Sequence, residues 1–249
     1  MSFQDHFSKQ AQMYARHRPT YPEAVFDYLA GLAPGHDLAW DCGAGNGQVA
    51  MQLAQHFEQV FATDASAEQI ENAFPLARVE YCVEQAERTS LITDSVDLIT
   101  VGVAVHWFDL DAFYAEARRV GKPGAILATW TYQLPAIEPS VDRLVDDYYT
   151  HTLAGYWPES FHYVDERYST LPFPFEEIRP PDFAMQTIWT LPDLVGFLAS
   201  WSGTQRYMDT QGRNPLDAML PDLERAWGEG SRSRLAQWPL HFRIGRIPG

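Results

Sequence analysis

The architecture of this chain is encoded most clearly in Asp41-Cys42-Gly43-Ala44-Gly45-Asn46-Gly47. An apolar run, LAWDC over 38–42, leads into this stretch, and an amphipathic stretch over 47–56 follows it. Glycine adopts backbone angles that other residues avoid, and the free N–H groups at the start of a helix favour a polar ligand. The pattern predicts a strand, a tight glycine loop and a helix, with a ligand site at the loop.

Short apolar runs and amphipathic stretches alternate through the first half of the chain. Strands are expected at five runs rich in Val, Ile and aromatic residues: 38–42, 59–64, 78–83, 96–104 and 125–132. Helices are expected at four stretches that begin with capping or first-turn residues: 22–33, 47–56, 66–73 and 109–120. This order predicts parallel strands joined by crossover helices, so the expected fold class is α/β with a doubly wound sheet.

The texture of the sequence changes after about residue 133. Prolines interrupt residues 135–181 and aromatic residues are dense there, which predicts an irregular, packed lid or insertion. Regular structure is expected again in a strand at 182–190, helices at 191–201 and 215–227, and a closing strand at 238–247. We expect two parts: residues 1–133, an N-terminal lid helix plus the ligand-binding core, and residues 134–249, a substrate-covering lid and the closing strands of the same sheet.

Composition limits the partners of this chain. Its 249 residues carry 33 acidic and 18 basic side chains, and the net charge of −15 argues against a nucleic-acid substrate. Cys42 and Cys82 lack CxxC spacing and a neighbouring histidine cluster, so neither a disulfide framework nor a metal site is expected. The sequence contains neither an apolar leader nor the run of about 18 apolar residues that spans a bilayer. We expect a cytoplasmic protein that acts on a small molecule, and the sequence leaves its oligomeric state open.

A second acidic residue extends the chemistry expected at the loop. Asp64 ends the second predicted strand, about twenty residues after the loop, where a carboxylate accepts hydrogen bonds from ribose hydroxyls. A dinucleotide site favours GxGxxG, but Gln48 stands at the third glycine position and the run is GxGxG. The residues therefore predict a nucleoside site, and their spacing disfavours a dinucleotide.

The stretch 41–47 resembles motif I of the class I S-adenosylmethionine-dependent methyltransferases, a family with a Rossmann-like, seven-stranded sheet. Segments 84–87 (EQAE), 96–99 (VDLI) and 119–125 (RVGKPGA) are similar to further motifs of the family. The resemblance implies S-adenosyl-L-methionine as cofactor, with Asp64 on the ribose and Gln85, where relatives commonly have Asp, at the adenine edge. The cofactor-binding residues that it implies are Tyr14, Arg18, Asp41, Gly43, Ala44, Gly45, Asp64, Ala65, Gln69, Gln85, Ala86, Glu87 and Val103.

Two segments resemble a narrower branch of small-molecule methyltransferases. Residues 7–22 are similar to an N-terminal Y…RP.YP segment, and residues 106–109 are similar to an HWFD segment after the fourth strand. Both occur in relatives of the trans-aconitate and cantharidin methyltransferases, which methylate carboxylates on small polyacids. The resemblance implies O-methylation of a small carboxylate by in-line displacement, with positioning as the main catalytic effect.

Candidate catalytic and substrate-binding residues follow the fourth predicted strand. We expect His106 to be catalytic, either by holding an acceptor anion or, for a hydroxyl acceptor, as a base that titrates near pH 6.5. We expect Trp107 to face the substrate or the sulfonium through its ring. Arg16, His17 and Arg18 form a cationic run that is a further candidate anion holder. The structural alternatives are a loop-packing histidine, a tryptophan in the core or lid, and an arginine paired with a surface acid.

Two other functions remain open from the sequence. A nicotinamide-dependent oxidoreductase would use a similar sheet and loop, although Gln48 disfavours it. A methyltransferase-like protein that binds the cofactor without turnover would keep the loop and Asp64 intact. Within the leading hypothesis, the methylated atom of the acceptor is not specified.

Overall fold

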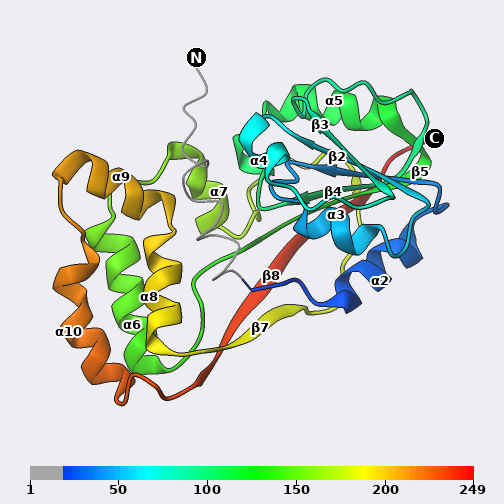
Figure 1. The fold of residues 1–249 in the computed structure, drawn as a ribbon. Coiled ribbons are helices and arrows are strands. Elements are labelled where there is room, and N and C mark those ends of the chain that lie inside the picture. The colour runs from blue at the N-terminus through cyan, green and yellow to red at the C-terminus, as the bar shows by residue number, and fades with distance from the viewer. Residues whose placement is uncertain (1–18) are drawn as a thin grey trace. The chain divides into compact units, whose positions relative to one another are not determined.

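The computed structural model describes residues 19–249, which group into two compact units (Figure 1). The sheet unit comprises Tyr21–Tyr132, His162–Phe183 and Leu240–Gly249. The helical unit comprises Gln133–Phe161 and Ala184–Pro239, together with residues 19–20. Within residues 19–249, no helix has the length and apolar character needed to cross a bilayer.

The sheet unit is built on five parallel strands in the order β3-β2-β1-β4-β5. Their bounds are β1 (Leu38–Cys42), β2 (Gln59–Asp64), β3 (Val79–Val83), β4 (Val96–Gly102) and β5 (Gly121–Tyr132). β1 and β4 are buried along almost their whole length, as central strands covered on both faces must be. The strand order reverses between β1 and β4, and ligands of open α/β sheets bind at the carboxyl ends of the strands at such a point.

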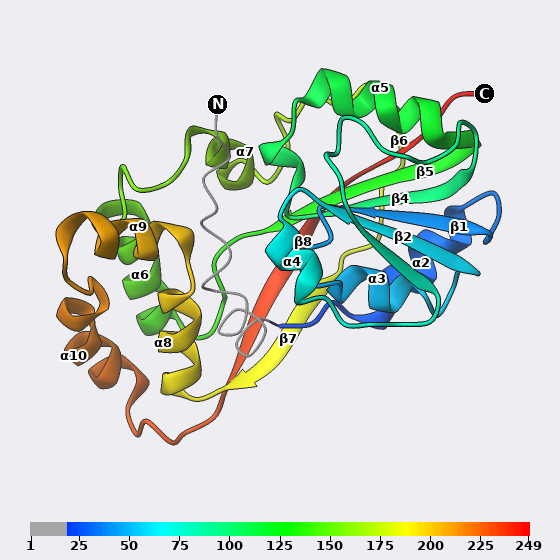
Figure 2. The ribbon, with the colours of Figure 1, turned by 45° about the horizontal axis from the view of Figure 1, so that its top comes forward.

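Helices cover both faces of the parallel strands. They are α2 (Glu23–Leu32), α3 (Gln48–Leu53), α4 (Ala67–Glu71), the 3-10 turn η2 (Val105–Trp107) and α5 (Leu110–Val120). Figures 1 and 2 show α2 and α3 on one face and α5 on the opposite face. Ser66 and Asp109 cap α4 and α5, because their side chains accept hydrogen bonds from backbone N–H groups in the first turn.

The last segments of the chain extend this sheet. β8 (Arg234–Arg246) pairs antiparallel with β5, and the short β6 (Glu176–Glu177) pairs with β8 at the edge. α7 (His162–Asp165) also belongs to the sheet unit. The resulting sheet has eight strands: seven follow the order β3-β2-β1-β4-β5-β8-β6, and β7 pairs with β8 outside this path. The predicted α/β class and doubly wound sheet are confirmed.

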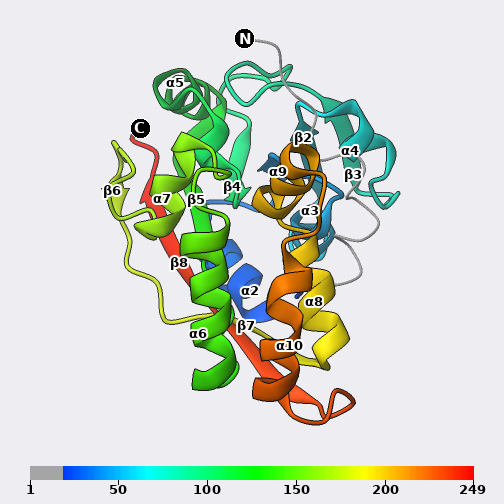
Figure 3. The ribbon, with the colours of Figure 1, turned by 90° about the vertical axis from the view of Figure 1, so that its left-hand side faces the viewer.

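The helical unit contains four longer helices and a two-stranded ribbon. The helices are α6 (Pro139–Asp147), which continues into the π-helical turn η3 (Tyr148–Thr152), α8 (Leu191–Ala199), α9 (Ser202–Gln211) and α10 (Leu216–Trp227). The ribbon joins β7 (Ala184–Trp189) to the first part of β8, and a 3-10 turn, η4, spans Glu159–Phe161. Figure 3 shows α6, α8 and α10 side by side, and buried apolar side chains line each of them.

The prediction of an irregular insertion over residues 135–181 is wrong for its first part, which forms the helix α6. Pro139 stands in the first turn of α6, where its missing N–H is not needed and its fixed φ suits a helix. Pro192 holds the equivalent place in α8. Residues 166–183 do lack regular structure apart from β6. The role of residues 134–249 as a substrate-covering lid stays a prediction.

Candidate cofactor and acceptor site

The glycine loop joins β1 to α3 and is held by β2. The N–H groups of Gly43 and Ala44 donate to the Thr63 carbonyl at 2.8 and 2.9 Å. Gly43 and Gly45 have φ angles of +70° and +55°, which favour glycine. A Cβ on Gly43 would lie 2.6 Å from the Ala104 Cβ, whereas a Cβ on Gly45 would meet, among the atoms of residues 19–249 within 4 Å, Gln69 Oε1 alone, at 3.8 Å. Gly43 therefore permits close packing, and within the described part of the chain Gly45 leaves open space beside the loop.

Asp64, at the carboxyl end of β2, is bound directly to the loop. Its Oδ2 accepts a hydrogen bond from the Gly45 N–H at 2.9 Å, and its Oδ1 accepts one from the Ser66 N–H at 2.9 Å. Burial raises the pKa of this carboxyl, and the two N–H groups oppose the shift. The two amides fix the orientation of the carboxylate, and each oxygen has a further lone pair that can accept from a ligand hydroxyl.

Asp41, at the end of β1, is a buried carboxyl group next to the loop. Its side chain is 1% exposed, and the Thr100 hydroxyl donates to its Oδ1 at 3.1 Å. Burial raises the pKa of Asp41 to about 7, while the Thr100 hydroxyl acts in the opposite direction. A cation bound nearby would favour the ionised form of this group.

The segments that follow β2 and β3 supply four more of the expected cofactor residues. Ala65 and Gln85 are exposed, and Ala86 is buried. Glu87 Oε1 accepts a hydrogen bond from the Asp109 N–H at 2.9 Å and so holds the start of α5. This contact gives Glu87 a structural role beside the cofactor role that the sequence predicts.

Val103, directly after β4, has a strained backbone. Its φ of 56° lies in the left-handed region, which a β-branched side chain rarely enters. The conformation lets its N–H donate to the Trp130 carbonyl on β5 at 2.9 Å. Such strain costs about 1–3 kcal/mol and is typical of functional sites.

His106 follows in η2 and is 5% exposed. Its Nδ1 lies 2.8 Å from the hydroxyl of Tyr168, and its ring centroid lies 5.0 Å from that of Trp107, which is 42% exposed. Burial lowers the pKa of His106 to about 3, so the imidazole is neutral at pH 7. A positively charged His106 that holds an anion, and a His106 that titrates near pH 6.5, are therefore both inconsistent with this buried, neutral imidazole.

The described residues of the predicted site meet at one edge of the sheet unit. Asp41, Asp64, Gln85 and Val103 stand at or just after the carboxyl ends of β1, β2, β3 and β4. Tyr14, Arg16, His17 and Arg18 lie outside the described residues, so their predicted roles are not tested. In residues 19–249, no group of three or more His, Cys, Asp or Glu side chains is arranged to hold a metal ion.

Sequence reasoning missed one residue that the structure brings into this region. Tyr168 lies 62 positions from His106 in the chain, and no local pattern indicates their contact.

Comparisons with known proteins agree on one enzyme class. Residues 40–129 match the family described as "Methyltransferase domain". A Dictyostelium discoideum protein with a methyltransferase name is 32% identical over 229 residues, which cover 90% of this chain and 87% of that relative. The match to the family domain coincides with β1 to β5, where the site residues lie.

A solved structure and a more distant relative complete the comparison. The structure, described as a type II methyltransferase from Anaeromyxobacter dehalogenans, superimposes with a TM-score of 0.86 and is 42% identical in sequence. The superposition covers 93% of this chain and 98% of the solved chain. The malonyl-[acyl-carrier protein] O-methyltransferase of Dechloromonas aromatica is 29% identical over 159 residues, which cover 59% of this chain and 60% of the relative.

Proposed function

The chain belongs to the class I S-adenosylmethionine-dependent methyltransferases, and we propose that it transfers the methyl group of S-adenosyl-L-methionine to a small-molecule acceptor. The observation that carries the proposal is the link between Gly45 and Asp64, because it sets a ribose-binding acid against an open glycine loop. A nucleoside with a charged amino-acid tail matches this pairing better than a dinucleotide with its pyrophosphate, since Gln48 replaces the third glycine of a dinucleotide loop.

The residues present fit this cofactor. In the proposal, Asp64 accepts hydrogen bonds from the ribose hydroxyls, and Gly45 leaves the space in which the nucleoside lies. Gln69, Ala65, Gln85 and Ala86 surround the adenine, with the Gln85 amide oxygen accepting from the adenine amino group. Asp41, Gly43, Ala44 and Val103 face the amino-acid part of the ligand, whose positive charge favours the ionised form of Asp41.

Positioning is the main contribution of this chain to the proposed reaction. The bound cofactor supplies an electrophilic methyl group on a sulfonium. The buried surroundings of His106 and the ring of Trp107 exclude water from the acceptor and fix its orientation. Because His106 is neutral at pH 7, it acts through hydrogen bonding and not through charge.

The favoured acceptor is a small carboxylate that is methylated on oxygen. Support comes from the HWFD segment at 106–109, from an O-methyltransferase among the relatives, and from the fact that a carboxylate is already ionised at pH 7. The net charge of −15 supports a small acceptor over a nucleic acid. The proposed place of the reaction is the cytoplasm. An NAD(P)-dependent oxidoreductase and a cofactor-binding protein without turnover are the alternatives.

Thermal unfolding with added ligands tests the proposal. S-adenosylmethionine and S-adenosylhomocysteine should each raise the melting temperature, and NAD, NADH, NADP and NADPH should leave it unchanged. Transfer of labelled methyl groups to a panel of carboxylic acids, phenols and amines then identifies the acceptor. Protection by a dinucleotide alone would reject the proposal, whereas protection by the adenosyl ligands without product from any acceptor would favour a binding protein.

A further inference from the structure

The turn that carries Tyr168 is strained and firmly held. Arg167 and Tyr168 have φ angles of 57° and 58°, two successive side-chain-bearing residues in the left-handed region. Arg243 Nη1, on β8, donates to the carbonyls of Tyr168 and Leu171 at 2.9 and 2.8 Å. The same guanidinium forms a two-point ion pair with Glu177, at 2.7 and 2.9 Å. These contacts hold a backbone conformation that an ordinary surface turn would not keep.

The strained turn places the Tyr168 side chain fully inside the sheet unit. Tyr168 is 0% exposed, and its hydroxyl lies 2.8 Å from His106 Nδ1. Burial raises the pKa of Tyr168 well above its ordinary value, so the phenol keeps its proton, and a hydrogen bond with Thr131 acts in the opposite direction. In the 2.8 Å contact the phenol is the stronger acid and the neutral imidazole nitrogen is the stronger base, so the Tyr168 O–H is the donor. The one proton of Tyr168 is then directed to His106.

We propose that Tyr168 is a positioning residue that donates to Nδ1 of His106 and thereby keeps the imidazole proton on Nε2. Nδ1 then accepts the hydrogen bond from Tyr168. Nε2 carries the N–H, which can be donated to the substrate that receives the methyl group. This inference rests on the proposed function, because it assigns His106 to the acceptor of the methyl transfer. It adds the tautomer of the His106 imidazole and identifies Tyr168 as the residue that sets this tautomer.

The assigned tautomer selects a class of acceptor. An Nε2–H group binds an oxygen that has lone pairs to offer, such as a carboxylate, and it cannot take a proton from an alcohol or amine. In the transfer, a carboxylate oxygen forms the new O–CH3 bond while the methyl–sulfur bond breaks and its electron pair stays on sulfur. No proton moves, and the products are a neutral methyl ester and a thioether. The pair of Tyr168 and His106 therefore favours acids over alcohols and amines.

Nitrogen NMR of the imidazole tests the tautomer without any substrate. The full chain is labelled with ¹⁵N-histidine at pH 7, and His106→Gln identifies the His106 signals by their loss. The expected spectrum shows a proton on Nε2 and an unprotonated Nδ1, and Tyr168→Phe should give a mixture of both tautomers. A proton on Nδ1 in the wild-type chain, or a doubly protonated ring, would overturn the proposal. The result does not depend on methyl transfer, so it can fail or succeed apart from the proposed function.

A matched tyrosine separates positioning from stability. Tyr114 is also buried, and its hydroxyl donates to the Pro172 carbonyl at 2.6 Å, so Tyr114→Phe removes one buried hydrogen bond without touching His106. The melting temperature should fall by a similar amount in Tyr168→Phe and in Tyr114→Phe. With di- and tricarboxylic acids as acceptors and S-adenosylhomocysteine as the measured product, Tyr168→Phe should lower kcat roughly tenfold and Tyr114→Phe less than twofold. Equal kcat losses in the two variants would assign Tyr168 to stability alone.

A conservative substitution at His106 completes the test. The amide nitrogen of His106→Gln lies near the position of Nε2, whereas that of His106→Asn lies near Nδ1, so Gln should retain more kcat than Asn. Tyr168→Phe should cause no further loss in the Gln background, because the tautomer it sets is absent there. Cofactor affinity, measured by calorimetry, should stay within threefold in all these variants. Additive losses from Tyr168→Phe and His106→Gln would contradict a role of Tyr168 through His106.

Discussion

The N–H of Gly45 donates a 2.9 Å hydrogen bond to Oδ2 of Asp64. These residues lie on different βα units, yet this contact and the Ser66 N–H on Oδ1 leave the carboxylate with a single orientation. An acid held in this way needs no rearrangement to accept hydroxyl groups, so a ligand avoids the cost of ordering it. Loop and acid therefore act as one preformed element of the candidate cofactor site.

Asp64→Ala should weaken binding of S-adenosylmethionine at least tenfold, because it removes a charged acceptor worth roughly 1.5–3 kcal/mol. Isothermal titration calorimetry on the folded variant measures the change. Glu71→Ala is the control, since this carboxylate is exposed at the end of α4, and it should retain wild-type affinity. An unchanged affinity in Asp64→Ala would place the ribose site elsewhere.

Gly45→Val should also weaken cofactor binding at least tenfold, since it fills the open space beside the loop and strains a φ of +55°. Gly212→Val isolates the effect of strain, because Gly212 ends α9 in the helical unit with a φ of +66°, and a Cβ added there would meet no atom of residues 19–249 within 4 Å. Both variants should lose stability, measured by urea unfolding. Cofactor affinity should fall in Gly45→Val alone.

The sequence predicted the parallel core well because each strand there has a clear local pattern. The bounds of β1 and β2 agree with the predicted 38–42 and 59–64, and Asp64 stands at its expected strand end. Apolar runs of this kind are buried on both faces and leave little freedom of assignment. The glycine loop was equally readable, since its spacing reflects backbone angles and close approach.

Features that depend on distant contacts were not predictable in this way. α6 was interpreted as irregular because proline both breaks helices and begins them, and the distinction at Pro139 depends on which residues pack behind it. The neutral state of His106 follows from its burial, and its hydrogen-bond partner Tyr168 lies 62 residues away in the chain. Burial and long-range pairing of this kind are properties of the folded chain and leave no local signature at 106–109.

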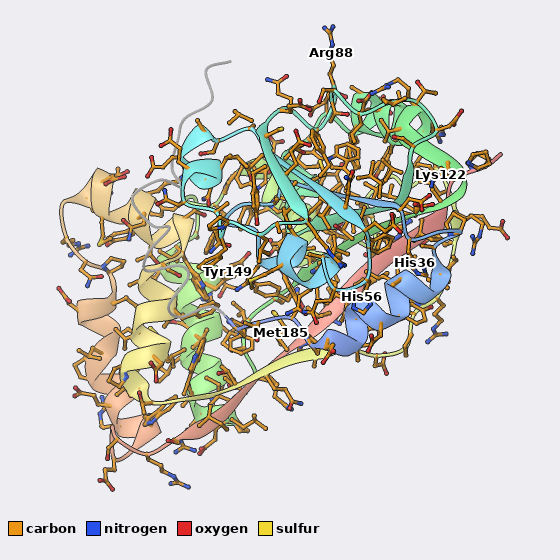
Figure 4. All side chains as sticks on the ribbon, turned by 45° about the vertical axis from the view of Figure 1, so that its right-hand side comes forward. His36, His56, Arg88, Lys122, Tyr149 and Met185 are labelled. Atoms are coloured by element: carbon orange, nitrogen blue, oxygen red, sulfur yellow. The ribbon has the colours of Figure 1, made fainter. Side chains whose placement is uncertain are left out.

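Lys122→Met should destabilise the sheet unit by about 3 kcal/mol, because it leaves the buried Asp97 carboxylate without its cation. Asp97 is 1% exposed, and its Oδ2 accepts from the N–H groups of Asp37 and Leu38 and from Lys122 Nζ at 2.9 Å. Lys122 lies near the start of β5, at the edge opposite the strand ends of the site, and Figure 4 labels it together with His36 at the same end. Cofactor affinity should therefore not change.

Arg88→Met is the matched control for Lys122→Met, because it removes the same charge from an exposed side chain that points outward in Figure 4. Its free energy of unfolding in urea should stay within about 0.5 kcal/mol of the wild-type value. Equal losses in the two variants would mean that net charge, and not the ion pair with Asp97, determines the effect.

Asp41→Asn should change how stability depends on pH. Burial raises the pKa of Asp41 to about 7 in the folded chain, above the ordinary value of 3.8. A carboxyl group with a raised pKa favours folding at pH values below 3.8, and this contribution is lost as the pH rises toward 7. Asn can still accept the Thr100 hydrogen bond but has no charge to desolvate, so the variant should gain stability relative to the wild type between pH 4 and 7.5. The gain is on the order of 4 kcal/mol at most.

Urea unfolding at pH 4.5 and 7.5 measures this gain in the free energy of unfolding, with the exposed Asp111→Asn as control. A difference between wild type and Asp41→Asn that is the same at both pH values would show that Asp41 is ionised throughout, and that its burial is compensated in the folded chain.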